Sequence, residues 1–230
     1  MPKNRLWTFI VIATAICSLS SAAYAALEDV SAAPDAALYG SATVFHRGTA
    51  AFPQWTDVMR RAVDEARSKR VCASAAESGC VPAEWRALLE TIAPLPLMAK
   101  LETVNRVFNA QPYVPAWQNW HRPSYWETPF EFLTRGGQCE DYAIAKYLAL
   151  HAAGVGDDVI RVLIVRDTDL GADHAVLLAD VGGQSYLLDN LQPRIVSAAL
   201  ATQYRPYYAI NLSGFWTYFG GRSMFAAARG

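Results

Sequence analysis

The sequence contains no apolar run long enough to cross a lipid bilayer and no excess of positive charge. Its first apolar stretch, residues 6–16, is short against the roughly 20 residues of a membrane-spanning helix, and no stop-transfer pattern follows it. Lys and Arg number 20 against 21 Asp and Glu, for a formal net charge of −1, which offers little attraction to a nucleic-acid polyanion. We therefore expect no stable membrane insertion and no nucleic-acid partner.

Internal repeats, charge blocks and low-complexity linkers are also missing, which argues against a chain of several modules. The first 25 residues have the order of a secretory signal peptide: basic residues, the apolar stretch, then small residues ending in Ala25. We expect residues 1–25 to be removed and the protein to be periplasmic. Residues 26–50 are expected to form an extended or loosely attached N-terminal arm, ahead of a single monomeric domain, residues 51–230.

Cysteine is scarce, with 4 residues in the whole chain. Cys17 lies in the expected signal peptide. In an oxidising compartment Cys72 and Cys80, separated by a short polar segment, are predicted to form a local disulfide, which leaves Cys139 as the free thiol. The alternatives for the pair are two reduced thiols, or a zinc site for which no second ligand pair lies nearby.

The N-terminal half shows helical periodicity, whereas the C-terminal half changes to a period of two. Residues 159–165, 174–181 and 185–189 are predicted to be strands, with Gly182-Gly183 as a hairpin turn. Helices followed by a sheet within one unit predict an α+β fold. The apolar helical stripes are Trp55, Val58, Met59, Ala62, Val63 and Ala66 after Pro53, then Trp85, Leu88, Leu89 and Ile92 after Pro82, then Leu97, Leu101, Val104 and Phe108.

Between these two halves, residues 109–134 are rich in aromatic residues and contain four prolines. We expect this segment to be a packed irregular loop. Most of its rings are expected to serve packing, with Trp120 and Trp126 as the candidates to line a substrate cleft.

Cys139 follows the pair Gly136-Gly137 and opens a run of helix formers that reaches Gly154. A helix from Cys139 to Ala152 would place the thiol in its first turn. Unpaired backbone N–H groups and the positive end of the helix dipole there favour the thiolate over the thiol. The alternative is a buried structural cysteine.

His174 and Asp189 are coupled by the predicted hairpin. If Gly182 and Gly183 form a two-residue turn, Asp189 faces Val176, which lies two positions from His174 on the same face. Such diagonal neighbours lie roughly 7–8 Å apart at the backbone, close enough for a carboxylate to bind an imidazole N–H. A bulged three-residue turn would break this register. The alternative for His174 is a surface histidine at a strand edge.

Cys139, His174 and Asp189 would thus supply the nucleophile, the base and the residue that orients the base, as in a cysteine hydrolase. The backbone N–H of Cys139 is the natural first donor to an oxyanion. Trp120, Trp126 and Asn105 are the open candidates for the second donor.

Three ordered motifs, with one segment upstream, resemble the bacterial transglutaminase-like cysteine proteinases. Within that family they resemble the LapG-type periplasmic adhesin proteases, and the likeness covers roughly residues 50–218. The segments are Lys100-Leu-Glu-Thr-Val-Asn-Arg-Val-Phe-Asn, Trp126-Glu-Thr-Pro-Phe-Glu-Phe-Leu-Thr-Arg-Gly-Gly-Gln-Cys-Glu-Asp-Tyr-Ala-Ile-Ala-Lys-Tyr, Asp173-His174-Ala-Val-Leu and Tyr186-Leu-Leu-Asp189-Asn-Leu.

The resemblance implies a papain-like or transglutaminase-like fold, with Cys139, His174 and Asp189 as the triad. It also implies cleavage of a large surface adhesin near its N-terminus, at a small-residue site of the Ala-Ala type, so that cells detach from a biofilm. It further implies dependence on calcium and an inner-membrane receptor that reads cyclic di-GMP.

The chain departs from this family at Gln138, where the family usually has Asp. Calcium prefers several carboxylate oxygens, and an amide oxygen replaces one at reduced charge. We therefore expect a weakened calcium site at Glu140, Asp141 and the side-chain carbonyl of Gln138. The alternative is that Glu140 and Asp141 are only first-turn acids favoured by the helix dipole.

Two other functions remain open at the level of the sequence. The same thiolate could transfer an acyl group to an amine instead of water, which incorporation of a labelled amine would reveal. Alternatively, Gln138 could mark the decay of the site into a non-catalytic module that only occupies a receptor. Slow alkylation of Cys139 would favour that module.

Overall fold

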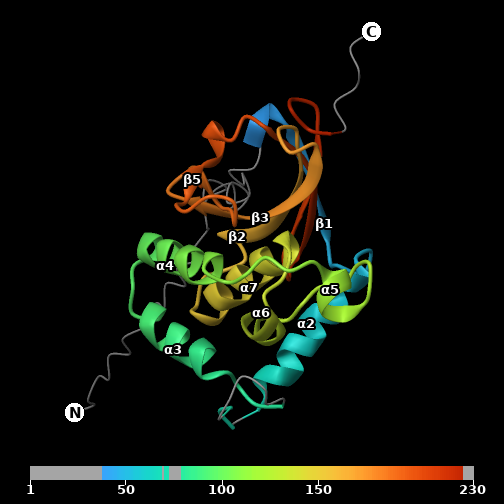
Figure 1. Ribbon diagram of the computed structural model, residues 1–230. Coiled ribbons are helices and arrows are strands. Elements are labelled where there is room, and N and C mark those ends of the chain that lie inside the picture. The colour runs from blue at the N-terminus through green and yellow to red at the C-terminus, as the bar shows by residue number, and fades with distance from the viewer. Residues whose placement is uncertain (1–37, 69, 73–78, 225–230) are drawn as a thin grey trace, which may run out of the picture. The chain divides into compact units, whose positions relative to one another are not determined.

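An antiparallel sheet of seven strands, with helices packed against one face, makes up the part of the chain that the computed structural model describes (Figure 1). The described residues are 38–68, 70–72 and 79–224, so the predicted signal peptide, residues 1–25, lies outside them. The α+β class predicted from the sequence is confirmed. None of the helices in the described ranges is long and apolar enough to cross a membrane.

The sheet has the strand order β1-β7-β6-β2-β3-β4-β5. The helices are α2 (Pro53–Ala66), α3 (Ala83–Ile92), α4 (Leu97–Asn109), α5 (Ala116–Trp120), α6 (Pro129–Arg135) and α7 (Cys139–Ala152), with a short 3-10 helix η2 (Ala198–Leu200). The strands are β1 (Ala42–Arg47), β2 (Ile160–Asp167), β3 (Ala172–Val181), β4 (Gln184–Leu188), β5 (Val196–Ser197), β6 (Tyr204–Ile210) and β7 (Gly214–Phe219).

Residues 26–50 were expected to form an extended or loosely attached arm, and strand β1 shows that residues 42–47 are extended but firmly paired. Along its whole length β1 pairs with β7, from Ala42 opposite Phe219 to Arg47 opposite Gly214. Its side chains are mostly exposed, so the segment carries no apolar alternation of its own. It is held as a strand by hydrogen bonds to a partner far away in the sequence.

Helix α5 and most of α6, which ends at Arg135, lie within residues 109–134, which were expected to be irregular. The start of α6 has a capping box: the Thr128 hydroxyl accepts the backbone N–H of Glu131, and the Glu131 carboxylate accepts the backbone N–H of Thr128. Pro129 suits the first turn of this helix because its missing N–H would have had no partner there. The density of aromatic rings and prolines had concealed this local signal.

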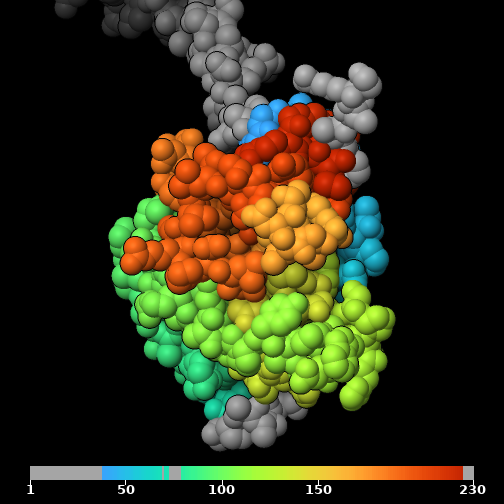
Figure 2. Space-filling model, turned by 45° about the horizontal axis from the view of Figure 1, so that its top comes forward, coloured from blue at the N-terminus to red at the C-terminus, as the bar shows by residue number. Residues whose placement is uncertain are grey.

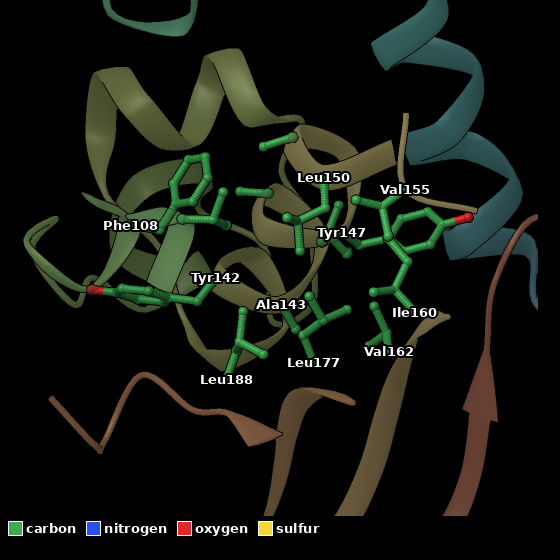
Figure 3. Packing of buried hydrophobic residues seen from close by; sticks show 14 of the residues in the cluster. Phe108, Tyr142, Ala143, Tyr147, Leu150, Val155, Ile160, Val162, Leu177 and Leu188 are labelled. Atoms are coloured by element: carbon green, nitrogen blue, oxygen red, sulfur yellow. The ribbon is translucent and has the colours of Figure 1, made fainter. Parts of the chain in front are cut away.

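Helix α7 lies in the centre of the fold and has the bounds that were predicted for it, Cys139–Ala152. It packs against β2 and β3 on one side and α4 and α6 on the other. Figure 3 shows the α7 side chains Ala143, Tyr147 and Leu150 among apolar side chains from those strands. Because the helix is buried almost all round, its first residue has a rigid support.

The hairpin of β3 and β4 has the predicted register, with Leu177 opposite Leu188 and Val181 opposite Gln184. Gly182 and Gly183 both have positive φ, 59° and 79°, as a two-residue turn of this kind requires. Asp189 therefore follows directly after β4, one position beyond the Leu177–Leu188 pair.

Cys72 and Cys80 form the predicted disulfide, with their sulfurs 2.11 Å apart. The bridge lies between α2 and α3, beside a short pairing of Val71 with Val81. Residues 73–78, which the bridge encloses, lie outside the described ranges.

Candidate active site

The side chains of His174 and Asp189 meet as predicted. His174 Nε2 lies 2.9 Å from Asp189 Oδ1, and both side chains are buried. The same Oδ1 accepts the backbone N–H of Leu191 at 2.9 Å, and Oδ2 accepts the hydroxyl of Tyr204. Burial alone would raise the pKa of Asp189, but the hydrogen bonds from His174 and Tyr204 together hold it below its usual range. Asp189 is therefore a carboxylate that can orient the imidazole.

Cys139 reaches the same strand at the residue after His174. The backbone N–H of Ala175 hydrogen-bonds the sulfur of Cys139, so the first residue of α7 and the first part of β3 lie against each other. Since Nε2 of His174 is engaged by Asp189, Nδ1 is the ring nitrogen left to exchange a proton with a thiol. The structure thus brings the three predicted residues to one place.

The ionisation predicted for Cys139 is wrong for the structure as it stands. Burial raises the pKa of the Cys139 thiol, and the charge of Glu140 together with its hydrogen bond raises it further. Cys139 Sγ donates that bond to Glu140 Oε2 at 3.1 Å. The N–H groups of Ala175 and Glu140 act in the opposite direction but are weaker. A favourable position at a helix start is therefore outweighed by burial and a neighbouring carboxylate.

The residues that flank Cys139, which were predicted to hold calcium, are hydrogen-bonded to other groups of the protein in this structure. Asp141 is buried, and its two oxygens accept the backbone N–H groups of Glu127 at 2.7 Å and Gln138 at 2.9 Å. Gln138 donates its Nε2 to Glu140 Oε1 at 2.6 Å and accepts the Ala116 N–H at 3.3 Å. Over the described ranges, no three His, Cys, Asp or Glu side chains gather as metal ligands. Asp141 and Gln138 instead hold the turn that leads into α7.

Glu127 is a second buried acid, which no pattern of residues had indicated as part of the site. Its Oε1 accepts Asn119 Nδ2 at 3.0 Å and Trp120 Nε1 at 2.5 Å, while Oε2 is buried without a partner among the described residues. Burial raises the pKa of Glu127 against these hydrogen bonds. The pKa of Asp141 is raised by its own burial and by the charge of Glu127, so the two acids lie close together.

Two of the three candidates for the second oxyanion donor are engaged elsewhere. The only N–H of the Trp120 indole donates to Glu127. Asn105 is buried under the loop after β4, where its Nδ2 lies 3.5 Å from the carbonyl of Gln192. Trp120 is therefore excluded as a donor in this arrangement, and Asn105 has a supporting position.

Lys146 is a fully buried residue of α7 that was not predicted to belong to the site. Its Nζ donates to Asn105 Oδ1 at 2.9 Å and to the carbonyl of Leu188 at 3.2 Å, directly before Asp189. Burial lowers the pKa of Lys146 to about 7, against the charge of Asp189, which raises it. Asn109 adds a bond of 2.8 Å to the carbonyl of Asp189. Helices α4 and α7 thus fix the loop that carries the acid.

The glycine pair before Cys139 allows another segment to pass close by. Tyr113 and Gly137 form a parallel bridge, in which Val114 N donates to Gly137 O at 2.9 Å and Gly137 N donates to Pro112 O at 3.2 Å. A Cβ atom at Gly136 would lie only 2.2 Å from Pro112 O, and its φ of 72° also favours glycine.

Comparison with known proteins agrees with this geometry. The family model of the bacterial transglutaminase-like cysteine proteinases matches residues 69–217. Calcium-bound Legionella pneumophila LapG is 31% identical with a TM-score of 0.53, over 58% of this chain and 76% of that protein. EGTA-treated Legionella pneumophila LapG is 24% identical with a TM-score of 0.53, over 75% and 87%. A comparison with curated proteins gives no match.

Proposed function

Because the chain belongs to the bacterial transglutaminase-like cysteine proteinases and is a cysteine peptidase, we propose that it is a periplasmic endopeptidase that cuts the N-terminal region of a large surface adhesin. Release of the adhesin would promote the detachment of cells from a biofilm. Similarity to Legionella pneumophila LapG supports this assignment. In this proposal an inner-membrane receptor for cyclic di-GMP holds the enzyme and regulates it.

One observation carries the proposed chemistry: His174 is fixed by Asp189, and Cys139 lies at the N–H of the next residue, Ala175. Nδ1 of His174 takes the proton of Cys139 Sγ, and the thiolate attacks the peptide carbonyl to form a tetrahedral adduct. The backbone N–H of Cys139 stabilises the oxyanion. His174 then protonates the leaving amine, and a water that it deprotonates hydrolyses the thioester.

Calcium is the proposed cofactor, because Legionella pneumophila LapG has calcium-bound and EGTA-treated forms. Of the three predicted ligands, only Glu140 fits. Its two oxygens face the Gln138 amide and the Cys139 thiol, whereas both oxygens of Asp141 are held by backbone N–H groups. The buried, unpartnered Oε2 of Glu127 is the candidate for a second carboxylate ligand.

A bound ion would neutralise the Glu140 carboxylate, which now accepts the thiol proton of Cys139. Without that acceptor the Sγ proton is free to move to His174. Gln138, which turns an N–H toward Glu140, opposes the ion and is the physical reason to expect weak binding.

The proposal is tested by incubating the protein without residues 1–25 with the N-terminal fragment of a large repeat adhesin from the same organism. We expect cleavage in the presence of calcium, a large loss with EGTA, and none with Cys139→Ala at an unchanged melting temperature. Cleavage that survives in Cys139→Ala would refute the peptidase assignment. Cleavage that EGTA leaves unchanged would refute the calcium dependence and leave the peptidase assignment standing.

A further inference from the structure

The short extended segment from Pro112 to Val114 forms a free edge beside the proposed nucleophile. It pairs with Gly137, two residues before Cys139, in a parallel bridge. Tyr113, at the centre of the segment, is 59% exposed. Burial first, and then the negative charges of Glu140 and Asp141, raise the pKa of its phenol, which places the ring near the start of α7.

The backbone of Tyr113 points away from Gly137. In an extended chain successive peptide groups alternate in direction, and the groups that face Gly137 are the carbonyl of Pro112 and the N–H of Val114. The N–H and the C=O of Tyr113 therefore face the opposite side. Neither takes part in a hydrogen bond within the ranges that the structure describes. They form an open donor and acceptor pair on an exposed edge.

The open edge is restricted to one residue. On the side that Tyr113 faces, Pro115 has no N–H to offer. Gln111 already donates its N–H to Phe108 O and accepts the Tyr142 hydroxyl with its carbonyl. Proline beside an exposed edge is a common means of preventing it from pairing without limit. What remains open is a pair of hydrogen bonds suited to a single residue of an extended peptide.

The position of His174 indicates which half of a substrate lies on this edge. His174 protonates the leaving amine, so the amine half lies toward β3. The acyl half then lies on the other side of Cys139, over Gly137 and Tyr113. Figure 2 shows the yellow surface of the region around residue 140 between the light green of the region around residues 110–125 and the orange of the sheet side.

Resting on the proposed peptidase activity, we propose that Tyr113 binds the acyl half of the substrate as an added β-strand, with its backbone N–H and C=O paired to one substrate residue. The ligand class is an extended peptide that is recognised through its main chain. Gly136 serves this arrangement because a Cβ atom there would lie 2.2 Å from the carbonyl oxygen of Pro112 and would push the segment away.

The test uses acetyl-Ala-Ala-Ala-Ala chloromethyl ketone, which alkylates an active-site thiol, and its four isomers N-methylated at one alanine each. The rate of alkylation of Cys139 by each probe is divided by the rate with iodoacetamide, so that changes in thiol reactivity cancel. We expect N-methylation of one alanine to lower this ratio about tenfold or more in the wild type, since one hydrogen bond is lost and a methyl group is added.

The matched variants are Tyr113→Pro, which removes the backbone N–H, and Tyr113→Ala, which removes only the side chain. Tyr113→Pro is expected to lower the ratio for the parent probe about tenfold and Tyr113→Ala clearly less. Equal losses in the two variants, four N-methyl isomers as fast as the parent, or a parent probe no faster than iodoacetamide would each overturn the proposal.

The adhesin assay separates this inference from the proposed function. If the protein cleaves the adhesin but Cys139 is alkylated equally fast by the parent and the N-methylated probes, the proposal for Tyr113 is rejected and the peptidase assignment stands. A protein that neither cleaves the adhesin nor reacts at Cys139 rejects both. Melting temperatures of the two variants within a few degrees of the wild type show that the comparison concerns folded protein.

Discussion

Tyr204 on β6 is the residue whose hydroxyl completes the environment of Asp189. Replacing it in Tyr204→Phe removes a hydrogen bond to a carboxylate, which is worth about 1.5–3 kcal/mol. We expect kcat/KM to fall about tenfold and the pKa of Asp189 to rise, because this bond helps to lower it. The measurement is kcat/KM against pH. The control is Tyr186→Phe, whose hydroxyl binds only the exposed Gln184; equal losses in both would contradict the assignment.

Lys146 makes the free energy of unfolding rise with pH. Its pKa in the folded protein is about 7, against about 10.4 in an unfolded chain. Between these values the unfolded chain binds a proton that the folded one does not, so the free energy of unfolding rises with pH by up to about 1.4 kcal/mol per pH unit. Below pH 7 the full cost of burying the charge remains.

The variant Lys146→Met has no such titration. We therefore expect the melting temperature of the wild type, measured relative to that of Lys146→Met, to rise as the pH is raised from 7 to 9. Lys100→Met, which removes a half-buried lysine bound to the carbonyl of Ala153, controls for the loss of a lysine in general. A difference between wild type and Lys146→Met that stays constant with pH would show that Lys146 keeps its proton.

At the scale of the elements, the capping box of α6 sets the entry of the chain toward the glycine pair. Thr128→Ala removes the acceptor of the Glu131 N–H and is expected to cost about 1 kcal/mol in free energy of unfolding, measured in urea. Thr134→Ala, at the exposed end of the same helix, is the matched control and should change stability little. Similar losses in both variants would show that the cap contributes nothing specific.

Elements with strong local signals were predictable and those held by distant partners were not. Helix α7 has a polar start at Cys139 and a glycine at its end, and the hairpin register followed from Gly182-Gly183. Strands β6 and β7 were not predicted, nor was β1, in which Thr43 pairs with Tyr218. No pattern within six residues indicates a partner so far along the chain.

The same division applies to the candidate site. The contact of His174 with Asp189 was predicted because a single turn determines it. Glu127, Lys146 and Tyr204 were missed because tertiary packing, and no local pattern, buries them beside the site. The ionisation of Cys139 was predicted wrongly because the spacing of residues does not show in which direction the Glu140 carboxylate points.

For the molecule as a whole, the disulfide between Cys72 and Cys80 restricts the unfolded chain. The two cysteines are separated by 8 positions, and closing a loop of that size is worth roughly 2.5 kcal/mol in the chain-entropy account. We expect the double variant Cys72→Ser, Cys80→Ser to unfold at lower urea by about that free energy. Reduced wild type should show the same loss, and an unchanged midpoint in both would show that the bridge adds no stability.

The burial of α7 also determines how the protein loses activity on heating. Amide hydrogens of a helix enclosed by α4, α6 and the sheet exchange with solvent only when the whole cooperative unit opens. Cys139 is the first residue of that helix, so the thiol keeps its place only while the helix remains folded. Thermal inactivation and global unfolding are therefore expected at the same temperature.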